Sequence, residues 1–440
     1  MQHGGQSDRE NTRLQADLVM RMSTLFRIVT VSREWTRTLT LDDNESIFAI
    51  QVRARNLSMS LNQLNRRDLI RGAVGGLVAA TIPAAHAVDR KEDSPQLIVR
   101  GGSPLNAETP VEAFDSYLTP IDRFFVRSHF GPPSAVANPE LNVEGMVKNP
   151  LKLNRLEWSR LKRVTLPAVL QCSGNGRALF SPKVPGVGWE RGAVGNAEWT
   201  GFQLKELLEM AGIAAEARHV HLLGSDAPPH PRTPAFFRSI PIERALDPST
   251  LIAFQMNNAS LPRLHGGPLR LIVPGWAGNH WVKWLRTITI ATEEAPGFYM
   301  KTGYRMPRTP VSPGVNMKPE ETVPVTTLNV KSLISSPTVG HRLAPKQVKI
   351  QGVAWTGPGR VTKLEVSMDG GPWSSAELYG PDHENAWRLW RFDWQPTPGK
   401  HEVRARATDS SGDVQPETTP WNKSGYLWNG IESVAFEVLP

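Results

Sequence analysis

Short runs of apolar and alternating residues dominate the last quarter of the chain. Residues 348–355 and 361–368 are rich in apolar side chains, and an Asp-Gly-Gly turn follows the second run. Charged and apolar residues alternate over 402–407, a period of two that puts one face of a strand in a core and the other in solvent. Turn-forming residues follow at 410–413. The pattern predicts an antiparallel, immunoglobulin-like β-sandwich over residues 326–440.

The preceding region, residues 88–325, mixes helical and strand-like patterns. Residues 204–210 have helical character, whereas 219–223 and 269–273 are predicted to be buried strands. Long connections rich in Pro and Gly separate these elements, so we predict an α+β domain and no regular strand–helix alternation. A proline-rich stretch at 307–325 predicts a linker to the sandwich.

Residues 59–87 have the pattern of an export signal. The adjacent Arg66 and Arg67 precede a weakly apolar stretch, 73–85, which contains Gly and Pro and is too short to span a bilayer. The stretch ends in an Ala-His-Ala sequence typical of a cleavage site. Paired arginines favour the twin-arginine pathway, which exports folded, cofactor-loaded proteins. We therefore expect a periplasmic protein without an integral membrane span; an ordinary secretory signal is the alternative.

The chain thus divides into four predicted segments. Residues 1–58 show no periodic pattern, and we expect this part to be disordered: it is either an upstream extension or the result of a misassigned start at Met1, with translation beginning at Met59. A signal peptide follows at 59–87, then the mixed domain at 88–325 and the sandwich at 326–440.

Charge and aromatic content narrow the class of partner. The chain of 440 residues has 50 Lys and Arg against 42 Asp and Glu, a formal net charge of +8. A positive balance favours anionic partners. Because no block of basic residues and no nucleic-acid motif is present, we predict a small anionic substrate and no nucleic acid. The 14 Trp against 5 Tyr suit rigid pockets and sandwich cores.

The only cysteine of the sequence, Cys172, is the main candidate for chemistry. A single cysteine cannot form an internal disulfide, and most single cysteines are small buried apolar residues. Three features favour a metal ligand here. The thiol follows a predicted strand, 166–170; Gly174 and Gly176 allow a bulky group to approach the backbone; and Arg177 favours thiolate over thiol. We predict a soft metal centre delivered within a ready-made cofactor.

Histidines leave one alternative open. A cysteine nucleophile would need a base, and His129, His265 or His280 are candidates, although no familiar protease signature surrounds the thiol. His219 and His221 lie on the same face of a predicted strand and superficially resemble a metal pair. No further ligand lies at a characteristic spacing, so we interpret this pair as structural.

Several sequence blocks in the right order resemble the sulfite oxidase family of molybdenum enzymes. The resemblance extends from about residue 124 to the C-terminus, which includes the predicted sandwich. The blocks are Phe-Val-Arg-Ser-His at 125–129, Gln-Cys-Ser-Gly-Asn-Gly-Arg at 171–177, and the segments 188–199, 265–270, 281–285, 299–305, 352–355 and 366–371.

The resemblance implies a molybdenum–molybdopterin cofactor, with Cys172 as the ligand to the metal. It implies a first domain of the sulfite-oxidase molybdopterin-binding type and a second domain used for dimerisation. The residues that it assigns to cofactor binding are Phe125, Val126, Arg127, Ser128, His129, Cys172, Asp226, His265, Arg270, Trp281, Val282 and Lys283.

It also implies the catalytic residues Arg127, Arg177, Trp189 and Tyr304. Sulfite is a compact dianion, and arginine suits it because the guanidinium is always charged and can hold two oxygens. We expect both arginines to bind the anion, Trp189 to wall the pocket, and Tyr304 to donate a hydrogen bond near the reacting atoms.

The activity implied is oxidation of sulfite to sulfate, with electrons passed to an external cytochrome c. We expect no haem in this chain, because one cysteine cannot complete a Cys-x-x-Cys-His attachment site. The dimerisation domain implies a homodimer.

One position departs from the family pattern. Animal-type members carry an arginine of the anion pocket where this chain has Ser424, with Lys423 beside it. This leaves other substrates open, and a sulfane dehydrogenase subunit or a methionine sulfoxide reductase are the alternatives on the same scaffold. A cofactor-free binding module, in which Cys172 is inert, is the alternative outside enzymes.

Overall fold

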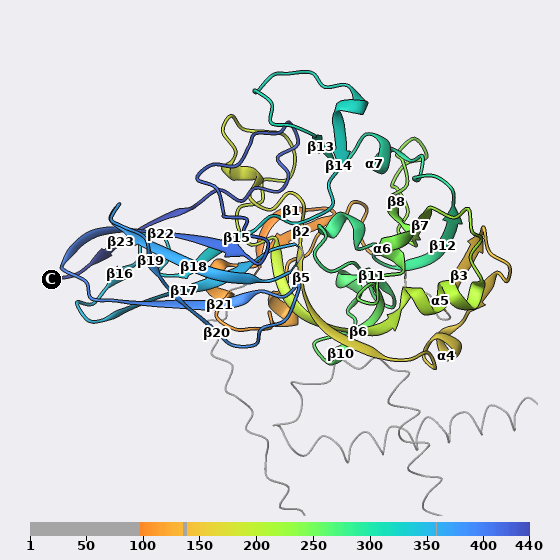
Figure 1. Ribbon diagram of the computed structural model, residues 1–440, viewed down its shortest axis with the longest axis horizontal. Coiled ribbons are helices and arrows are strands. Elements are labelled where there is room, and N and C mark those ends of the chain that lie inside the picture. The colour runs from red at the N-terminus through yellow and green to blue at the C-terminus, as the bar shows by residue number, and fades with distance from the viewer. Residues whose placement is uncertain (1–96, 135–138, 358) are drawn as a thin grey trace, which may run out of the picture. The chain divides into compact units, whose positions relative to one another are not determined.

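The computed structural model describes residues 97–134, 139–357 and 359–440 (Figure 1). The predicted extension at 1–58 and the predicted signal at 59–87 lie outside these residues. All described residues belong to one compact unit. Among them, no helix combines the length and apolar character needed to span a membrane.

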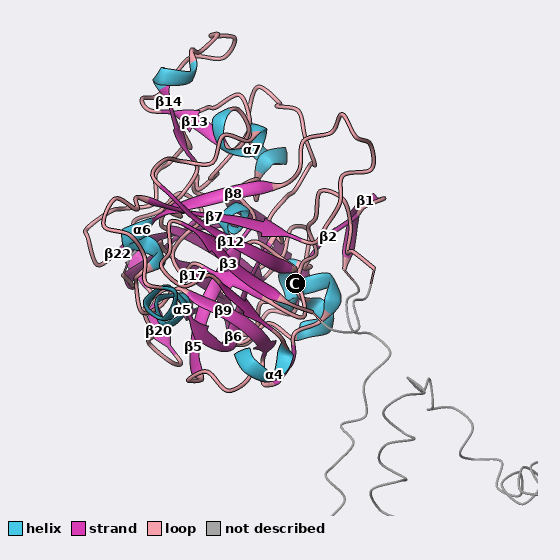
Figure 2. Ribbon diagram, turned by 90° about the vertical axis from the view of Figure 1, so that its right-hand side faces the viewer, coloured by secondary structure: helices cyan, strands magenta, loops and turns pink. Residues whose placement is uncertain are grey.

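Two five-stranded sheets form the first part of this unit, with most of its strands antiparallel (Figure 2). In one sheet the order is β10-β9-β6-β5, with β11 also paired to β9; in the other it is β4-β3-β12-β7-β8, where only β3 and β12 run parallel. The strands of the first sheet are β5 (Val164–Gln171), β6 (Val194–Gln203), β9 (Leu251–Met256), β10 (Ala259–Ser260) and β11 (Arg270–Ile272). Those of the second are β3 (Leu141–Gly145), β4 (Leu151–Leu153), β7 (His219–Gly224), β8 (Phe237–Pro241) and β12 (Leu285–Ala291).

Helices are short in the described part of the chain. The longest, α5 (Leu204–Ala211), confirms the helix predicted at 204–210; it buries Leu204, Leu207, Leu208 and Ala211, the spacing of one helical face. The other α-helices are α4 (Arg155–Trp158), α6 (Ile242–Ala245) and α7 (Phe298–Lys301). Single 3₁₀ turns lie at η1 (Val111–Ala113), η2 (Ile121–Arg123), η3 (Arg177–Leu179), η4 (Arg263–His265), η5 (Gly278–His280) and η6 (Pro319–Glu321).

The last part of the chain forms two facing sheets around an apolar core, as predicted. Their orders are β15-β17-β21-β20 and β16-β23-β22-β18-β19. Strands β17 (Val348–Trp355) and β18 (Val361–Met368) coincide with the predicted runs, and β22 (Gly399–Asp409) contains the alternating residues 402–407. The remaining strands are β15 (Lys331–Ser336), β16 (Arg342–Leu343), β19 (Ser374–Ser375), β20 (Glu377–Tyr379), β21 (Arg388–Trp394) and β23 (Ser433–Val438).

The predicted linker at 307–325 is more ordered than the sequence indicates. Strands β13 (Arg305–Pro307) and β14 (Thr322–Pro324) pair antiparallel at its two ends. The proline content predicts an extended connection. Proline is nevertheless tolerated in short edge strands, where its missing N–H is not needed for pairing, so the hairpin is compatible with the prolines. A second small hairpin, β1 (Ile98–Gly102) with β2 (Leu105–Glu108), was not predicted.

The sandwich packs directly on the strand that leads to Cys172. Trp355 of β17 donates its indole N–H to Gln171 Oε1 over 2.7 Å, and the Leu427 N–H donates to the Ser173 carbonyl over 2.8 Å. A shared apolar cluster includes Val169 of β5 and Trp387. Residues on both sides of the cysteine are therefore held by the C-terminal part of the chain.

Candidate active site

A tight loop after β5 carries Cys172. The Cys172 N–H donates to the Ala193 carbonyl over 2.9 Å, and the Asn175 side chain accepts the Ala193 N–H over 3.1 Å. Gly176 has a φ of 87°, in the left-handed region, and a Cβ there would lie 2.7 Å from Trp428 Cβ. Only glycine therefore fits this position. The thiol is 9% exposed, and this small surface faces a cavity.

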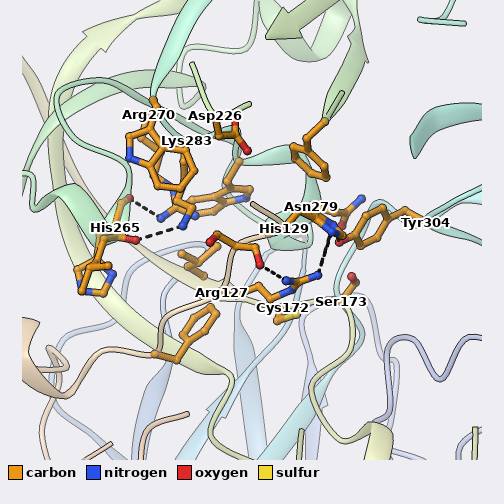
Figure 3. Close-up of a pocket in the computed structure, with 18 residues that line it drawn as sticks. Arg127, His129, Cys172, Ser173, Asp226, His265, Arg270, Asn279, Lys283 and Tyr304 are labelled. Carbon is orange, nitrogen blue, oxygen red and sulfur yellow. Dashed lines mark hydrogen bonds between the residues drawn. The ribbon is translucent and has the colours of Figure 1, made fainter. Parts of the chain in front are cut away.

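The cavity collects most of the predicted site residues (Figure 3). They come from the segment after η2, the end of β5, the segment after β7, η4, β11, the segment after η5, and the segment after α7. The predicted residues that line it are Phe125, Arg127, Ser128, His129, Cys172, Asp226, His265, Arg270, Trp281, Lys283 and Tyr304.

Three predicted residues do not place their side chains there. Trp189 is fully buried in the core of the first part, and it lines neither the cavity beside Cys172 nor the larger cavity that adjoins it. The expectation that Trp189 walls the pocket is therefore wrong: its indole packs into the domain interior. The side chains of Val126 and Val282 are also buried away from the cavity, and their backbones bond to Ala107 and Leu271.

A chain of polar contacts joins Arg127 to Tyr304. One guanidinium nitrogen of Arg127, Nη2, lies 3.3 Å from both ring nitrogens of His129, and His129 Nε2 lies 2.7 Å from Tyr304 Oη. Burial, with the positive charges of Arg127 and Lys283, lowers the pKa of His129 to about 3. The imidazole is therefore neutral at ordinary pH; with its proton on Nε2 it donates to Tyr304 Oη, which leaves the phenol proton free for another acceptor.

Tyr304 is held from several sides. Its φ of 55° is left-handed, which is uncommon for a residue with a side chain. Its ring stacks on Tyr426 with centroids 5.5 Å apart, and the buried Arg238 guanidinium lies 5.3 Å from its centroid. Burial raises the pKa of the Tyr304 phenol. The hydroxyl therefore stays protonated and can donate.

Cations gather at another side of the cavity. Arg270 is 6% exposed and donates to the His265 carbonyl over 2.8 Å, while its Nε has no partner among the described residues. Burial lowers the pKa of Arg270 to about 9. Burial and the charge of Arg270 lower the pKa of Lys283 well below its usual range. Asp226 is the carboxylate on this cavity, and burial raises its pKa to about 6.

These observations fit the cofactor that the sequence implies. Buried cations with depressed pKa values, and a guanidinium nitrogen without a partner, are stabilised by an anionic group such as a phosphate. The Cys172 thiol opens on the same cavity and supplies a soft ligand for a metal. In Figure 3, Arg270 and Lys283 lie together, and Cys172 lies apart from them next to Ser173. The residues therefore suit an elongated group with a metal at one end and an anion at the other.

Arg177 lies on an adjoining outer cavity of about 690 Å³ that shares Arg127, His129, Cys172 and Tyr304 with the inner one. Its Nε donates to the Ser424 carbonyl over 2.9 Å and its Nη1 to the Val187 carbonyl over 3.2 Å.

The departure noted in the sequence thus has a structural consequence. Ser424 meets Arg177 through its backbone, and Lys423 and Tyr426 line the same outer cavity. The C-terminal part of the chain therefore contributes side chains beside the predicted anion site.

Several residues near the site were missed by sequence reasoning. Ser173 and Asn279 line the inner cavity; Ser173 lies within the block 171–177 and Asn279 lies two residues before the block 281–285, so the blocks contained a signal for both. Tyr426 lies two residues after Ser424, in a stretch where the sequence analysis concerns only the charges at positions 423 and 424. Arg238 had no signal, because its position below Tyr304 depends on tertiary packing.

The structure excludes one of the three histidines that the sequence offers as a base for a cysteine nucleophile. His280 is buried, bonded to Arg238 and to the Val325 carbonyl, and does not line the inner cavity, so it is not placed to act as a base for Cys172. The described residues contain no cluster of three or more His, Cys, Asp or Glu suited to a metal ion.

Comparisons with known proteins place the chain among molybdenum enzymes. A family model described as "Oxidoreductase molybdopterin binding domain" matches residues 129–299, and one described as "Mo-co oxidoreductase dimerisation domain" matches 322–437. The chain is 36% identical to a sulfite oxidase of Gallus gallus over 76% of this chain and 76% of that protein. It is 35% identical to the sulfite oxidase of Arabidopsis thaliana over 76% of this chain and 92% of that protein.

A solved structure agrees with these relatives. The structure is similar to that of the sulfane dehydrogenase SoxCD from Paracoccus pantotrophus, with a TM-score of 0.68 and 27% identity, covering 79% of this chain and 91% of that one.

Proposed function

Because the chain belongs to the sulfite oxidase family of molybdopterin oxidoreductases, and so is a molybdenum-dependent oxidoreductase, we propose that it oxidises sulfite to sulfate. The observation that carries the proposal is the placement of Cys172, Arg127, His129 and Tyr304 on one cavity. A soft metal ligand, a positively charged side chain and a proton donor therefore line the same cavity.

The residues that would hold the cofactor follow from the fit described above. Cys172 would bind the metal, and Arg270, Lys283 and His265 would surround the anionic end. When bound, the cofactor supplies oxygen-atom transfer and takes up the two electrons released. Burial lowers the pKa of His265 to about 4, so this histidine enters the site neutral and can accept or donate a hydrogen bond.

The chain's own residues bind and orient the sulfite anion. Arg127 and Arg177 present guanidinium groups beside the thiol, and desolvation strengthens their attraction for an anion. Tyr304 donates from a hydroxyl fixed by the neutral His129, so no charge competes with the anion at that point. The stacked Tyr426 excludes water from the outer side of Tyr304.

We further propose that the electrons pass to an external cytochrome c, that the protein is exported to the periplasm by the twin-arginine pathway, and that it forms a homodimer. The match of residues 322–437 to a dimerisation domain supports the dimer. The paired arginines at Arg66 and Arg67 support the export route.

A sulfane dehydrogenase activity is the second candidate. The similarity to SoxCD favours it, as does the absence of a fixed positive side chain at Ser424. Such an enzyme would act on reduced sulfur and would not depend on a tightly held dianion.

Steady-state turnover tests the proposal. Molybdenum-replete protein exported by its native route should oxidise sulfite with oxidised cytochrome c as acceptor, and Cys172→Ser protein should not. Absence of sulfite-dependent reduction by protein with about one molybdenum per chain would contradict the proposal, and turnover of sulfane sulfur by the same sample would favour the second candidate.

A further inference from the structure

The outer cavity is strongly cationic. Six basic residues line it, and no Asp or Glu is present among the described residues that do so. The basic residues are Arg127, Arg177, Lys301, Arg305, Lys318 and Lys423. A cavity with this lining has a positive potential that favours an anionic occupant.

Nearby carboxylates cancel only part of this charge. Glu294 pairs with Lys301 at 3.0 Å and with Arg305 at 3.8 Å. The other four basic residues are Arg127, Arg177, Lys318 and Lys423. None of them lies within 4.0 Å of a carboxylate in residues 97–134, 139–357 and 359–440. The part of the cavity nearest Cys172 therefore keeps its positive charge.

Apolar side chains line the rest of the same cavity. Phe298 is 47% exposed and Val315 is 45% exposed, although both are large apolar residues, and Val311 and Met317 lie beside them. Trp421 also lines the cavity, and its indole N–H is already bonded to the Pro182 carbonyl over 3.1 Å. Its free surface is therefore mainly apolar. Exposed apolar surface next to a reactive centre is typical of a binding site for an apolar group.

Size and donor count argue against sulfite as the only ligand of this space. The cavity volume of about 690 Å³ lies in the range of sites for drug-sized molecules and far exceeds a compact inorganic anion. Arg177 has two of its guanidinium nitrogens bonded to the Ser424 and Val187 carbonyls, which leaves Nη2 as its contact for one anionic oxygen. The space suits one negative charge near Cys172 and an apolar body farther out.

We propose that the outer cavity binds organic sulfinates, R–SO₂⁻ with an apolar R group, and that the site oxidises them to sulfonates. The inference rests on the proposed function and extends its substrate class. A sulfinate keeps the lone pair on sulfur that sulfite uses, has one negative charge, and carries the R group that the apolar wall would hold.

The reaction balances without breaking the carbon–sulfur bond: R–SO₂⁻ + H₂O → R–SO₃⁻ + 2 H⁺ + 2 e⁻. One sulfur–oxygen bond forms, and both O–H bonds of water break. The electrons leave through the cofactor to the same one-electron carrier that sulfite oxidation requires.

Benzenesulfinate is the probe, and sulfite is the internal reference. Molybdenum-replete, full-chain protein should oxidise benzenesulfinate, and methanesulfinate should have a KM about tenfold higher because it lacks the apolar body. Turnover of sulfite without turnover of benzenesulfinate would overturn this inference and leave the proposed function intact. Turnover of neither would contradict both.

A charge-neutral double variant isolates the apolar wall. Phe298→Ser/Val315→Ser should raise the KM for benzenesulfinate about tenfold and leave the KM for sulfite within about twofold. The matched control is Leu156→Ser/Val339→Ser, which removes two apolar side chains that are 59% and 60% exposed and do not line the cavity. Equal KM values for benzenesulfinate in the double variant and the control would overturn the assigned site.

Equilibrium binding gives a readout independent of turnover. Calorimetric titration with benzenesulfonate, the product, should show saturable binding to the wild type that is about tenfold weaker in Phe298→Ser/Val315→Ser and unchanged in the control. No measurable binding to the wild type, or binding that the double variant keeps, would contradict an apolar product site in this cavity.

Discussion

Side chains from distant parts of the sequence meet at the thiol. Arg127 and His129 follow η2, Cys172 directly follows β5, and Tyr304 follows α7. The histidine between the guanidinium and the phenol is neutral, because burial and Arg127 both oppose its protonation. The arrangement keeps positive charge on Arg127 while it fixes the Tyr304 hydroxyl, which suits a site that must bind an anion and donate a proton.

Replacement of the thiol tests the metal-ligand role. In Cys172→Ser protein we expect loss of turnover by more than about a hundredfold with the fold retained, because a hydroxyl is a poorer ligand for a soft metal and is similar in size. Sulfite turnover and the unfolding midpoint measure the two effects separately. Retained wild-type turnover would refute the role.

A second prediction concerns the two arginines of the anion site, Arg127 and Arg177. Arg127→Gln and Arg177→Gln should each raise the KM for sulfite about tenfold or more, because a charged hydrogen-bond donor to the anion is lost. The exposed Arg286 of β12, which lines neither cavity, provides the control substitution Arg286→Gln. An unchanged KM in both arginine variants would locate the anion elsewhere.

At the scale of elements, the cysteine loop depends on the segment that precedes β23. Gly176 packs on Trp428, Ser173 accepts the Leu427 N–H, and Arg177 donates to Ser424. The sequence predicted the flexible glycines of this loop as space for a cofactor. The structure shows that Gly176 makes space for an indole of the same chain.

A pair of glycine substitutions measures this packing. Gly176→Ala and Gly314→Ala both place a side chain at a left-handed φ, 87° and 88°, but only the first adds a Cβ against other atoms. We expect about 1 kcal/mol of destabilisation for Gly314→Ala, and about 1–3 kcal/mol more for Gly176→Ala. Urea unfolding measures both. Equal losses of unfolding free energy in the two variants would show that the loop shifts to accommodate the new Cβ without a measurable energetic penalty.

Buried histidine also links elements and makes stability depend on pH. His280 of η5 contacts Arg238 of β8 at 3.0 Å and the Val325 carbonyl at 3.0 Å, and burial lowers its pKa well below the usual range. In the unfolded chain this histidine is protonated below about pH 6.5, whereas in the folded chain it stays neutral. The stability that His280 contributes is therefore present above that pH and decreases as the pH falls below it.

The slope of this loss is about 1.4 kcal/mol per pH unit for one proton. His280→Gln should therefore lose less stability than the wild type between pH 7.5 and pH 5, as measured by urea unfolding at both pH values. The same pH dependence in both proteins would show that His280 titrates normally.

Many elements could be predicted because their residues contain a local pattern. The helix at α5 and strands β17 and β18 follow from the spacing of apolar side chains. The β13–β14 hairpin could not, because its strands are three residues long and depend on pairing across a long loop rich in proline. The prediction that Trp189 lines the pocket was wrong for a related reason. A sequence block shows which residues are present, but it does not show in which direction a side chain points.

Over the whole molecule, buried charges join the two parts of the described chain. Arg191, from the segment before β6, lies 2.6 Å from Glu432, which directly precedes β23, and Lys331 of β15 lies in the aromatic environment of Trp428. Burial raises the pKa of Glu432 and lowers that of Lys331 to about 8. Removal of one member would leave a buried charge without compensation.

Glu432→Gln should therefore destabilise the protein by about 3–5 kcal/mol. The control is Glu437→Gln, whose partner Arg342 is largely exposed, and which should cost about 1 kcal/mol or less. The difference between the two unfolding free energies measures the buried contribution. A similar small loss in both would show that water reaches the buried cluster.

The inner site was largely predictable and the outer cavity was not. Short motifs identified the residues around Cys172, because their types and order are specific. The outer cavity is assembled from segments near residues 177, 300, 317 and 423, whose closeness only the folded chain reveals. Its cationic and apolar sides are therefore structural findings, and they give the site a wider substrate class than the motifs alone indicate.

The central claim is that Cys172 binds molybdenum, and X-ray absorption at the molybdenum edge tests it most directly. In molybdenum-loaded protein, the wild type should have one more sulfur neighbour around the metal than Cys172→Ser protein prepared in the same way. The same number of sulfur neighbours in both proteins would contradict the account.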